Sequence, residues 1–140
     1  MPNSATIPNF GQPEDVLLIT NESNKDLADE EVRVKMLAAP INPADINLIQ
    51  GVYGIRPDLP AVAGIEGCGE IIESQSPDLA CGDRVIFISH TGTWTEEVVC
   101  PASALLKIPE KTPAQQAAML KVNPLSAWCM LCLLYTSPSP

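Results

Sequence analysis

The chain has few of the residues on which several classes of function depend. It contains one histidine, His90, among 140 residues, and its 17 acidic residues outnumber its 8 basic ones, for a net charge of −9. A single histidine excludes a histidine-rich metal site, and the shortage of basic residues argues against nucleic acid as a partner. The longest apolar run, residues 125–134, is shorter than the ~20 residues of a membrane-spanning helix, so no membrane partner is predicted.

The N-terminal segment also lacks the features of a targeting signal. Residues 1–10 contain neither a basic region nor an apolar run, so no secretory signal is expected. The absence of arginine from this segment disfavours a mitochondrial transit peptide. The sequence therefore predicts a cytoplasmic protein, with a mitochondrial location as the alternative for a eukaryotic protein whose transit peptide is not seen. In such a reducing compartment the five cysteines need not pair.

The pattern of apolar residues predicts a mainly β domain with short helices. The content of hydrophobic residues, 46%, is enough for a folded core, and the length suits one domain. Short strands are predicted at residues 16–20, 31–36, 69–73, 83–88, 94–99 and 104–108. Several short strands at close spacing indicate a β-barrel or sandwich. Residues 21–30 are expected to form a solvated hairpin loop, and residues 52–65 a loop rich in proline and glycine.

Helices are predicted where a capping residue precedes proline. Asn42 and Pro43 open a helix that Gly51 ends, because asparagine caps free N–H groups and proline suits the first turn. Residues 112–115, Thr-Pro-Ala-Gln, have the spacing of a capping box. Asn123 and Pro124 repeat the first signal and are expected to start a further helix.

Two motifs that suggest cofactors have simpler interpretations. Residues 64–69 are rich in glycine, but they lead into a predicted strand, whereas a dinucleotide fingerprint opens a helix. A tight turn with close backbone packing is therefore expected there. Cys129 and Cys132 have C-x-x-C spacing in an apolar setting without a second pair, so no redox or metal role is expected. The other cysteines are expected to behave as small hydrophobic residues, and His90 as a surface turn residue.

Tyr53 is the residue with the clearest chemical potential. It follows the predicted 43–51 helix and lies between Gly51 and Gly54. A loop tyrosine on a rigid scaffold can present its hydroxyl to a cleft and donate a proton to a developing carbanion. A packed core or lid tyrosine would look the same, and the residues alone leave both interpretations open.

Several longer runs carry a family resemblance. Residues 37–54, which include Asn-x-Ile-Gln-Gly-x-Tyr-Gly at 47–54, are joined by 59–69, 82–86, 92–94 (Gly-Thr-Trp) and 122–127. Together they resemble the N-terminal catalytic domain of the medium-chain dehydrogenase/reductase superfamily. The branch they resemble is the NADPH-dependent trans-2-enoyl thioester reductases of fatty-acid synthesis, which are oxidoreductases of lipid metabolism.

This resemblance implies a zinc-free enzyme. Zinc-dependent members have a cysteine near the position of Asn42 and Gly-His-Glu where this sequence has residues 64–66, Gly-Ile-Glu. Without these ligands, neither a catalytic zinc nor the cysteine-bound structural zinc is expected. In the branch, NADPH gives hydride to Cβ of the enoyl thioester and the matching tyrosine protonates Cα. Tyr53 is therefore expected to be the general acid, and Asn123 to contact the nicotinamide end of NADPH. Trp94 is expected to be packing or pocket wall, and Glu66 a turn or core-polar residue.

The resemblance also implies a domain organisation. Residues 1–122 are expected to form a GroES-like barrel, as in the alcohol dehydrogenase N-terminal domain, and residues 123–131 to begin the crossover helix toward a missing Rossmann domain. Residues 132–140, CLLYTSPSP, fit the codons of a transposase sequencing adapter and are expected to be non-native; a native Ser/Pro tail is the alternative. Because the missing domain would hold most of the NADPH, the fragment alone is expected to be inactive.

The substrate and the alternatives follow from the same branch. The parent is expected to reduce an enoyl-CoA or an enoyl-acyl carrier protein, and the resemblance leaves a homodimer open. A zinc-free quinone oxidoreductase is the alternative within the superfamily. A non-enzymatic GroES-like interaction module is the alternative of another class.

Overall fold

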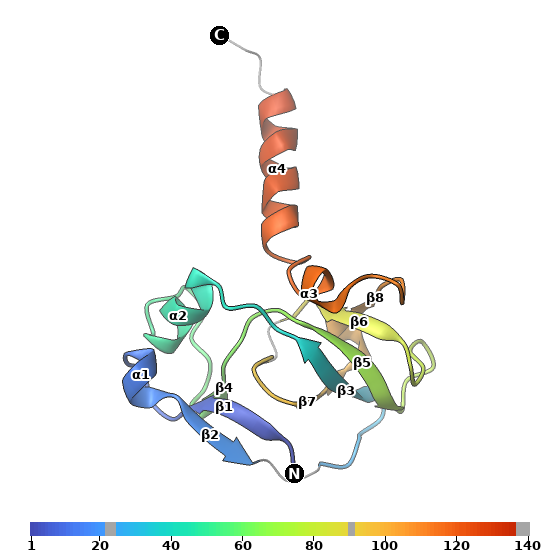
Figure 1. Cartoon of the computed structure of the whole chain (residues 1–140), viewed down its shortest axis with the longest axis horizontal. Helices are drawn as coiled ribbons and strands as arrows, with labels where there is room; N and C mark the ends of the chain where they lie inside the picture. Colours follow the sequence, from blue (N-terminus) through green and yellow to red (C-terminus); the bar gives the residue numbers. More distant parts are fainter. Residues whose placement is uncertain (22–24, 90–91, 137–140) are drawn as a thin grey trace.

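The structure is a computed structural model that describes residues 1–21, 25–89 and 92–136, with side chains described as far as residue 133 (Figure 1). His90, predicted to be a surface turn residue, lies outside the described residues. The mainly β fold is confirmed. The described part of the chain has no helix that is both long and apolar enough to cross a membrane.

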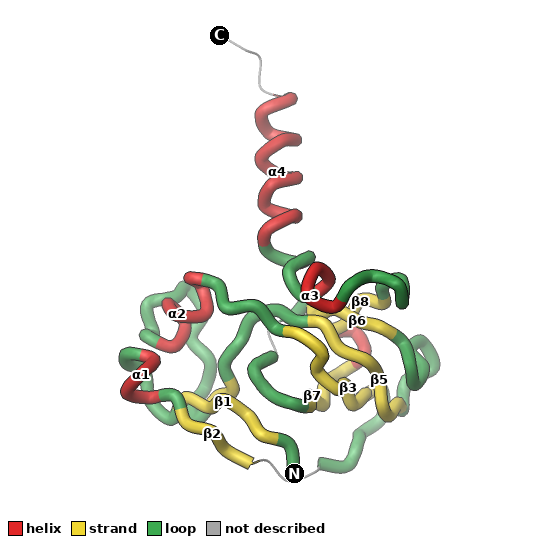
Figure 2. The backbone as a smooth tube through the Cα atoms, viewed as in Figure 1, coloured by secondary structure: helices red, strands yellow, loops and turns green. Residues whose placement is uncertain are grey.

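Two antiparallel sheets form the body of the protein (Figures 1 and 2). The smaller sheet has the order β2-β1-β4 and consists of Leu18–Asn21, Asn3–Ile7 and Ala61–Val62. The larger sheet has the order β7-β3-β5-β6-β8 and consists of Glu97–Pro101, Glu31–Ala38, Cys68–Ser74, Arg84–Phe87 and Leu105–Lys107. The sheets remain open rather than closing into the expected barrel. An isolated bridge between Ser4 and Thr95 links β1 to the segment before β7.

The helices are short apart from the last one. They are α1 (Pro13–Val16), α2 (Pro43–Ile49), a 3₁₀ turn (Ala102–Ala104), α3 (Ala114–Ala117) and α4 (Asn123–Thr136). Figure 1 shows α4 projecting away from the sheets. The large apolar side chains of α4 as far as residue 133 are exposed, including Trp128 at 66%. Helix α4 runs without a break past residue 131, so the helix does not mark where the expected non-native residues 132–140 begin. That boundary stays a prediction.

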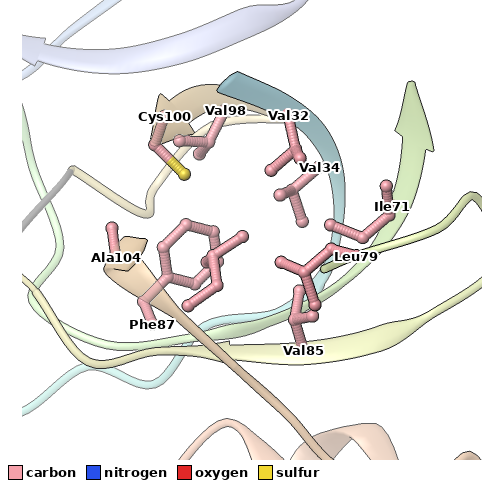
Figure 3. Packing of buried hydrophobic residues seen from close by; sticks show 10 residues of the cluster. Val32, Val34, Ile71, Leu79, Val85, Phe87, Val98, Cys100 and Ala104 are labelled. Atoms are coloured by element: carbon pink, nitrogen blue, oxygen red, sulfur yellow. The ribbon is translucent and has the colours of Figure 1, made fainter. Parts of the chain in front are cut away.

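The main core lies on the inner face of the larger sheet. Strand β3 alternates as the sequence predicts, with Val32 and Val34 buried and Lys35 exposed. Phe87 and Val85 of β6 and Ile71 of β5 pack against these valines (Figure 3). Burying such side chains stabilises the fold by ~1.5–3 kcal/mol each.

The structure differs from the predicted elements where pairing partners are distant. The predicted strand 16–20 is divided between the end of α1 and β2, because Pro13 starts a helical turn and its carbonyl accepts the Leu17 N–H at 3.0 Å. Strand β2 pairs with β1 rather than β3, so the predicted hairpin around residues 21–30 is wrong. Strand β4 lies within the predicted 52–65 loop, and β1 was not predicted.

Two predictions near the ends of elements also fail. Strand β7 begins at Glu97, three residues after the predicted start at 94, because Trp94 and Thr95 pair with β1 instead. The predicted capping box at residues 112–115 is wrong, because α3 begins at Ala114 and its N-cap is Pro113, which makes no side-chain cap. Cys68 and Cys100 are buried as expected, whereas Cys81 is exposed.

Candidate active site

The element that leads to the predicted proton donor, Tyr53, is α2. It begins after Asn42, as predicted, with Pro43 in its first turn. The carboxylate of Asp45 accepts the backbone N–H of Asn42 at 2.7 Å, which satisfies one of the free N–H groups of the helix start. Leu48 and Ile49 are buried on the inner side of the helix. The start and the inner face of α2 are therefore fixed by local polar contacts and by packing.

The end of α2 holds the backbone of Tyr53. The N–H of Gly51 donates to Leu48 O at 3.0 Å, and the N–H groups of Val52 and Tyr53 both donate to Asn47 O, at 3.0 and 3.1 Å. The Tyr53 side chain is half-buried and packs against a second apolar cluster under α2. This α2 cluster consists of the buried residues Ile7, Leu48, Ile49, Ala63 and Ile65. The phenol is thus held at the edge of a core and not enclosed within it.

The N-terminal segment supports the Tyr53 loop from outside. A Cβ on Gly51 would lie 2.7 Å from Cγ of Phe10, so the phenyl ring rests directly on the helix end. The N–H of Gly11 donates to Ile49 O at 3.1 Å. The guanidinium of Arg56 lies over the Phe10 ring, 5.9 Å from its centre, and links the far end of the loop to the same support.

A buried polar network connects α2 to the glycine-rich turn. Asp45, 1% exposed, accepts the backbone N–H of Ile65 at 2.9 Å, and Glu66, also 1% exposed, accepts Asn42 Nδ2 at 2.9 Å. The hydroxyl of Thr93 donates to Glu66 O at 2.7 Å. The predicted tight turn with close backbone packing is confirmed, and so is the core-polar environment of Glu66.

The same turn contacts the base of α4. The backbone N–H of Val122 donates to Oε2 of Glu66 at 3.0 Å, and Nζ of Lys121 donates to Ile65 O at 3.3 Å. Burial lowers the pKa of the Lys121 ammonium, and the negative charge of Glu66 partly offsets this effect. Asn123, the predicted cofactor contact, is exposed and follows directly as the first residue of α4.

A groove opens beside the network. It encloses about 390 Å³ between the end of β3 and the segment before β7, and its walls include Leu37, Ile41, Trp94 and Glu96. Trp94 also packs on the α2 cluster, and its indole N–H donates to Pro40 O at 3.1 Å. These contacts confirm the prediction that Trp94 is packing and pocket wall.

The structure does not place Tyr53 and Asn123 in direct contact. Tyr53 lies after the end of α2 and Asn123 at the base of α4, and Figure 1 shows both helices on the upper side of the sheets. The route between them runs through Asn42, Glu66 and Val122. Sequence reasoning missed Asp45 and Lys121 as parts of this site. The spacing of Asn42 and Asp45 is a capping-box signal that could have identified the first of them.

The described residues also bear on whether this part of the chain could hold a metal or a nucleotide. No group of His, Cys, Asp or Glu side chains suited to holding a metal ion occurs within residues 1–21, 25–89 and 92–136. The glycine-rich turn leads into β5, and not into a helix whose N-terminus could bind a pyrophosphate. Asn123, at the base of α4, stays the contact to the nicotinamide end of NADPH that the family resemblance implies.

Comparison with known proteins defines the family. Residues 28–110 match the alcohol dehydrogenase GroES-like domain, and the chain belongs to this family. It is 47% identical over 126 residues to the mitochondrial enoyl-[acyl-carrier-protein] reductase of Rattus norvegicus, an alignment that covers 88% of this chain and 34% of the rat protein. The chain thus spans about a third of the length of the curated relatives that it matches.

Solved structures agree with this assignment. A complex of Etr1p with NADP and crotonyl-CoA has a TM-score of 0.86 and 32% identity, covering 99% of this chain and 45% of that chain. A putative NADPH:quinone reductase from Bacillus thuringiensis has a TM-score of 0.82 and 36% identity, covering 92% of this chain and 40% of that chain. The fold is therefore shared by enzymes of both kinds.

Proposed function

We propose that the chain is the catalytic-domain part of an NADPH-dependent trans-2-enoyl thioester reductase of fatty-acid synthesis. The observation that carries this proposal is the 47% identity to an enoyl-[acyl-carrier-protein] reductase along 88% of the chain. The substrate would be an enoyl-CoA or an enoyl-acyl carrier protein, and the product the saturated acyl thioester. The crotonyl-CoA bound in the Etr1p structure supports this substrate class.

Tyr53 is proposed as the general acid. When bound, NADPH would supply hydride to Cβ of the substrate and leave as NADP⁺, so that negative charge would develop at Cα. The Tyr53 hydroxyl then donates its proton to Cα, and the phenolate regains a proton from solvent. The hydrogen bond from the Tyr53 N–H to Asn47 O and the packing of its ring on the α2 cluster support this role, because they hold the residue in place. Fixed orientation of this kind is a large part of what an active site contributes.

Asn123 is proposed to contact the nicotinamide end of NADPH. It is exposed at the base of α4, next to Val122, whose backbone is held by Glu66. Most of the cofactor would be bound by a Rossmann domain that follows residue 131 in the parent. The parent is proposed to use no zinc, because Asn42 and Ile65 stand where zinc-dependent relatives have ligands. The 140-residue chain alone is expected not to oxidise NADPH with an enoyl thioester.

The test is Tyr53→Phe in the full-length protein of the source organism. NADPH oxidation is followed at 340 nm with crotonyl-CoA, and kcat is expected to fall by about 10²–10⁴-fold, the contribution of a positioned general acid. The exposed neighbour Val52, changed to Ala, serves as the matched control and should leave kcat unchanged. An unchanged kcat in Tyr53→Phe would refute the role of Tyr53.

Quinone reduction is the second candidate, favoured by the likeness to the Bacillus thuringiensis structure. The same two variants distinguish the candidates when a quinone replaces crotonyl-CoA. A quinone reductase would reduce the quinone equally well with and without the Tyr53 hydroxyl and would not reduce crotonyl-CoA.

The names of the relatives also bear on location. Relatives from animals and a plant are named as mitochondrial, which favours the mitochondrial alternative over the cytoplasmic prediction. We propose a mitochondrial parent if the source is eukaryotic, testable by fractionation of its cells. A homodimeric parent stays a proposal, to be tested by light scattering of the full-length protein.

A further inference from the structure

Glu66 joins three segments that are far apart in the sequence. Its side chain accepts Asn42 Nδ2 at 2.9 Å on one oxygen and the Val122 N–H at 3.0 Å on the other. Its backbone carbonyl accepts the Thr93 hydroxyl at 2.7 Å. The residue is 1% exposed, so these contacts are made away from water. A buried carboxylate is costly unless it is paired and hydrogen-bonded, and here two donors are aimed at it.

A lysine ammonium lies near Glu66 at the base of α4. The Lys121 ammonium donates to Ile65 O at 3.3 Å; burial lowers its pKa, and the negative charge of Glu66 partly offsets that effect. The Val122 N–H directly precedes the first turn of α4, where backbone donors lack partners within the helix. Glu66 therefore supplies both the acceptor and the negative charge that this position requires.

Two hydrogen bonds join the same turn to the start of α2. Asn42 binds Glu66 through its side chain, and Asp45 accepts the N–H of Ile65 at 2.9 Å. At the other end of this seven-residue helix, the N–H of Tyr53 is bonded to Asn47 O. A displacement of the turn relative to α2 or α4 would change the position of Tyr53 relative to Asn123.

We infer that Glu66 is a positioning residue that fixes α4 against α2, and thereby sets the geometry between the proton donor at Tyr53 and the cofactor contact at Asn123. The part of this inference that concerns α2 and α4 stands on the contacts alone. The part that concerns Tyr53 and Asn123 rests on the proposed function.

The first test measures the direction of α4 in the 140-residue chain and needs no activity. With Cys132 changed to Ser, the exposed Cys81 and Cys129 carry spin labels on the body and on α4, while the other two cysteines are buried. Double electron–electron resonance then gives the distribution of distances between the labels. The labelled chain is diluted with unlabelled chain so that only intramolecular distances contribute.

Glu66→Gln is expected to broaden this distribution. Glutamine keeps one acceptor, but its NH₂ group must face either Asn42 Nδ2 or the Val122 N–H, and the partner charge of Lys121 is lost. Glu70→Gln is the matched control, because Glu70 lies on β5 and pairs only loosely with Arg84, at 3.9 Å. An equally narrow distribution in Glu66→Gln and in the control would overturn the inference.

Lys121→Met provides the second variant if Glu66→Gln fails to fold. This half-buried side chain lies outside the turn, and its replacement removes the hydrogen bond to Ile65 O while Glu66 and its two donors stay in the sequence. The expected result is again a broader distribution, and an unchanged distribution would overturn the inference.

The second test uses the full-length protein. Because a misplacement of about 1 Å can cost about 100-fold in rate, Glu66→Gln is expected to lower kcat by ~10–100-fold with little change in KM. A loss expressed only in KM, or no loss at all, would contradict a positioning role. If the wild-type protein does not reduce enoyl thioesters, the proposed function fails, but the spin-label result still decides whether Glu66 fixes α4.

Discussion

Gly64, in the glycine-rich turn beneath the candidate site, is a position where a substitution is expected to lower stability strongly. Its φ of +99° lies in a region that residues with a side chain rarely adopt, and the residue is buried. A Cβ at this position would lie 2.5 Å from Thr93 Oγ1 and 2.8 Å from Trp94 N, and would also overlap Cδ1 of Trp94. Gly64→Ala therefore combines a strained backbone with a steric overlap that includes rigid backbone.

The loss in the free energy of unfolding is the sum of these two contributions. A residue held in a sparsely populated backbone region costs about 1–3 kcal/mol. Inserting an extra carbon into a packed site typically costs a further ~1–3 kcal/mol. Gly64→Ala should thus lower the free energy of unfolding by about 2–6 kcal/mol, a large part of the ~5–15 kcal/mol of a typical domain.

Gly82 and Gly54 separate the two contributions. Gly82 has a φ of +89° with no atom near its missing Cβ, so Gly82→Ala should show the backbone cost of about 1–3 kcal/mol alone. Gly54 has neither a positive φ nor a nearby atom, so Gly54→Ala should stabilise the chain by roughly 0.4–1 kcal/mol.

Urea denaturation followed by circular dichroism measures all three variants. The slope of the transition should stay constant, so that the midpoint reports stability. The expected order of stability is Gly54→Ala, wild type, Gly82→Ala and Gly64→Ala. If Gly64→Ala is no less stable than Gly82→Ala, the close packing of Thr93 and Trp94 on the turn is wrong.

Two further predictions concern titratable groups. At pH 8 a thiol reagent should modify the three exposed cysteines of the native chain but not Cys68 or Cys100. Burial raises the pKa of both buried thiols, that of Cys100 to about 12, so neither forms the reactive thiolate at pH 8. Labelling of Cys100 in the native chain, counted by mass spectrometry, would contradict this. The Asp83 carboxylate accepts the Ala80 N–H, and its Oδ1 lies 2.6 Å from Nζ of Lys107. These two donors hold the pKa of Asp83 below its ordinary 3.8. Its stabilisation is therefore complete above that value and is lost as the pH falls through the folded-state pKa, so urea midpoints of Asp83→Asn should decline less in acid than those of the wild type.

The sequence predicted the elements that depend on nearby residues. The alternation in residues 31–36 marks β3, because successive side chains of a strand point to opposite faces and one face lies on the core. Asn42, Pro43 and Gly51 mark α2, since its start and end are determined by residues within one turn. The loop position of Tyr53 follows directly from this helix end.

The elements that the sequence missed depend on distant partners. Strand β1 pairs with β4 through Thr6 and Val62, and no pattern within either segment predicts such a pairing. For the same reason, the link between Glu66 and Val122, 56 residues apart, is invisible in the sequence, and Glu66 could be identified only as a turn or core-polar residue. Residues 112–115 have the spacing of a capping box, but the N-cap of α3 is Pro113 and not Thr112, so no side chain caps the helix.

The candidate site is held by buried polar contacts as well as by apolar packing. In a chain with a net charge of −9, two carboxylates, Asp45 and Glu66, are 1% exposed. Burial of these charges is tolerated because backbone N–H groups of α2, the glycine-rich turn and the base of α4 bind them. Hydrogen bonds are directional and apolar contacts are not, so this network specifies how the segments are oriented as well as that they touch. Such a network suits a position that sets the loop after α2, with the proposed donor Tyr53, against the base of α4, with the proposed cofactor contact Asn123.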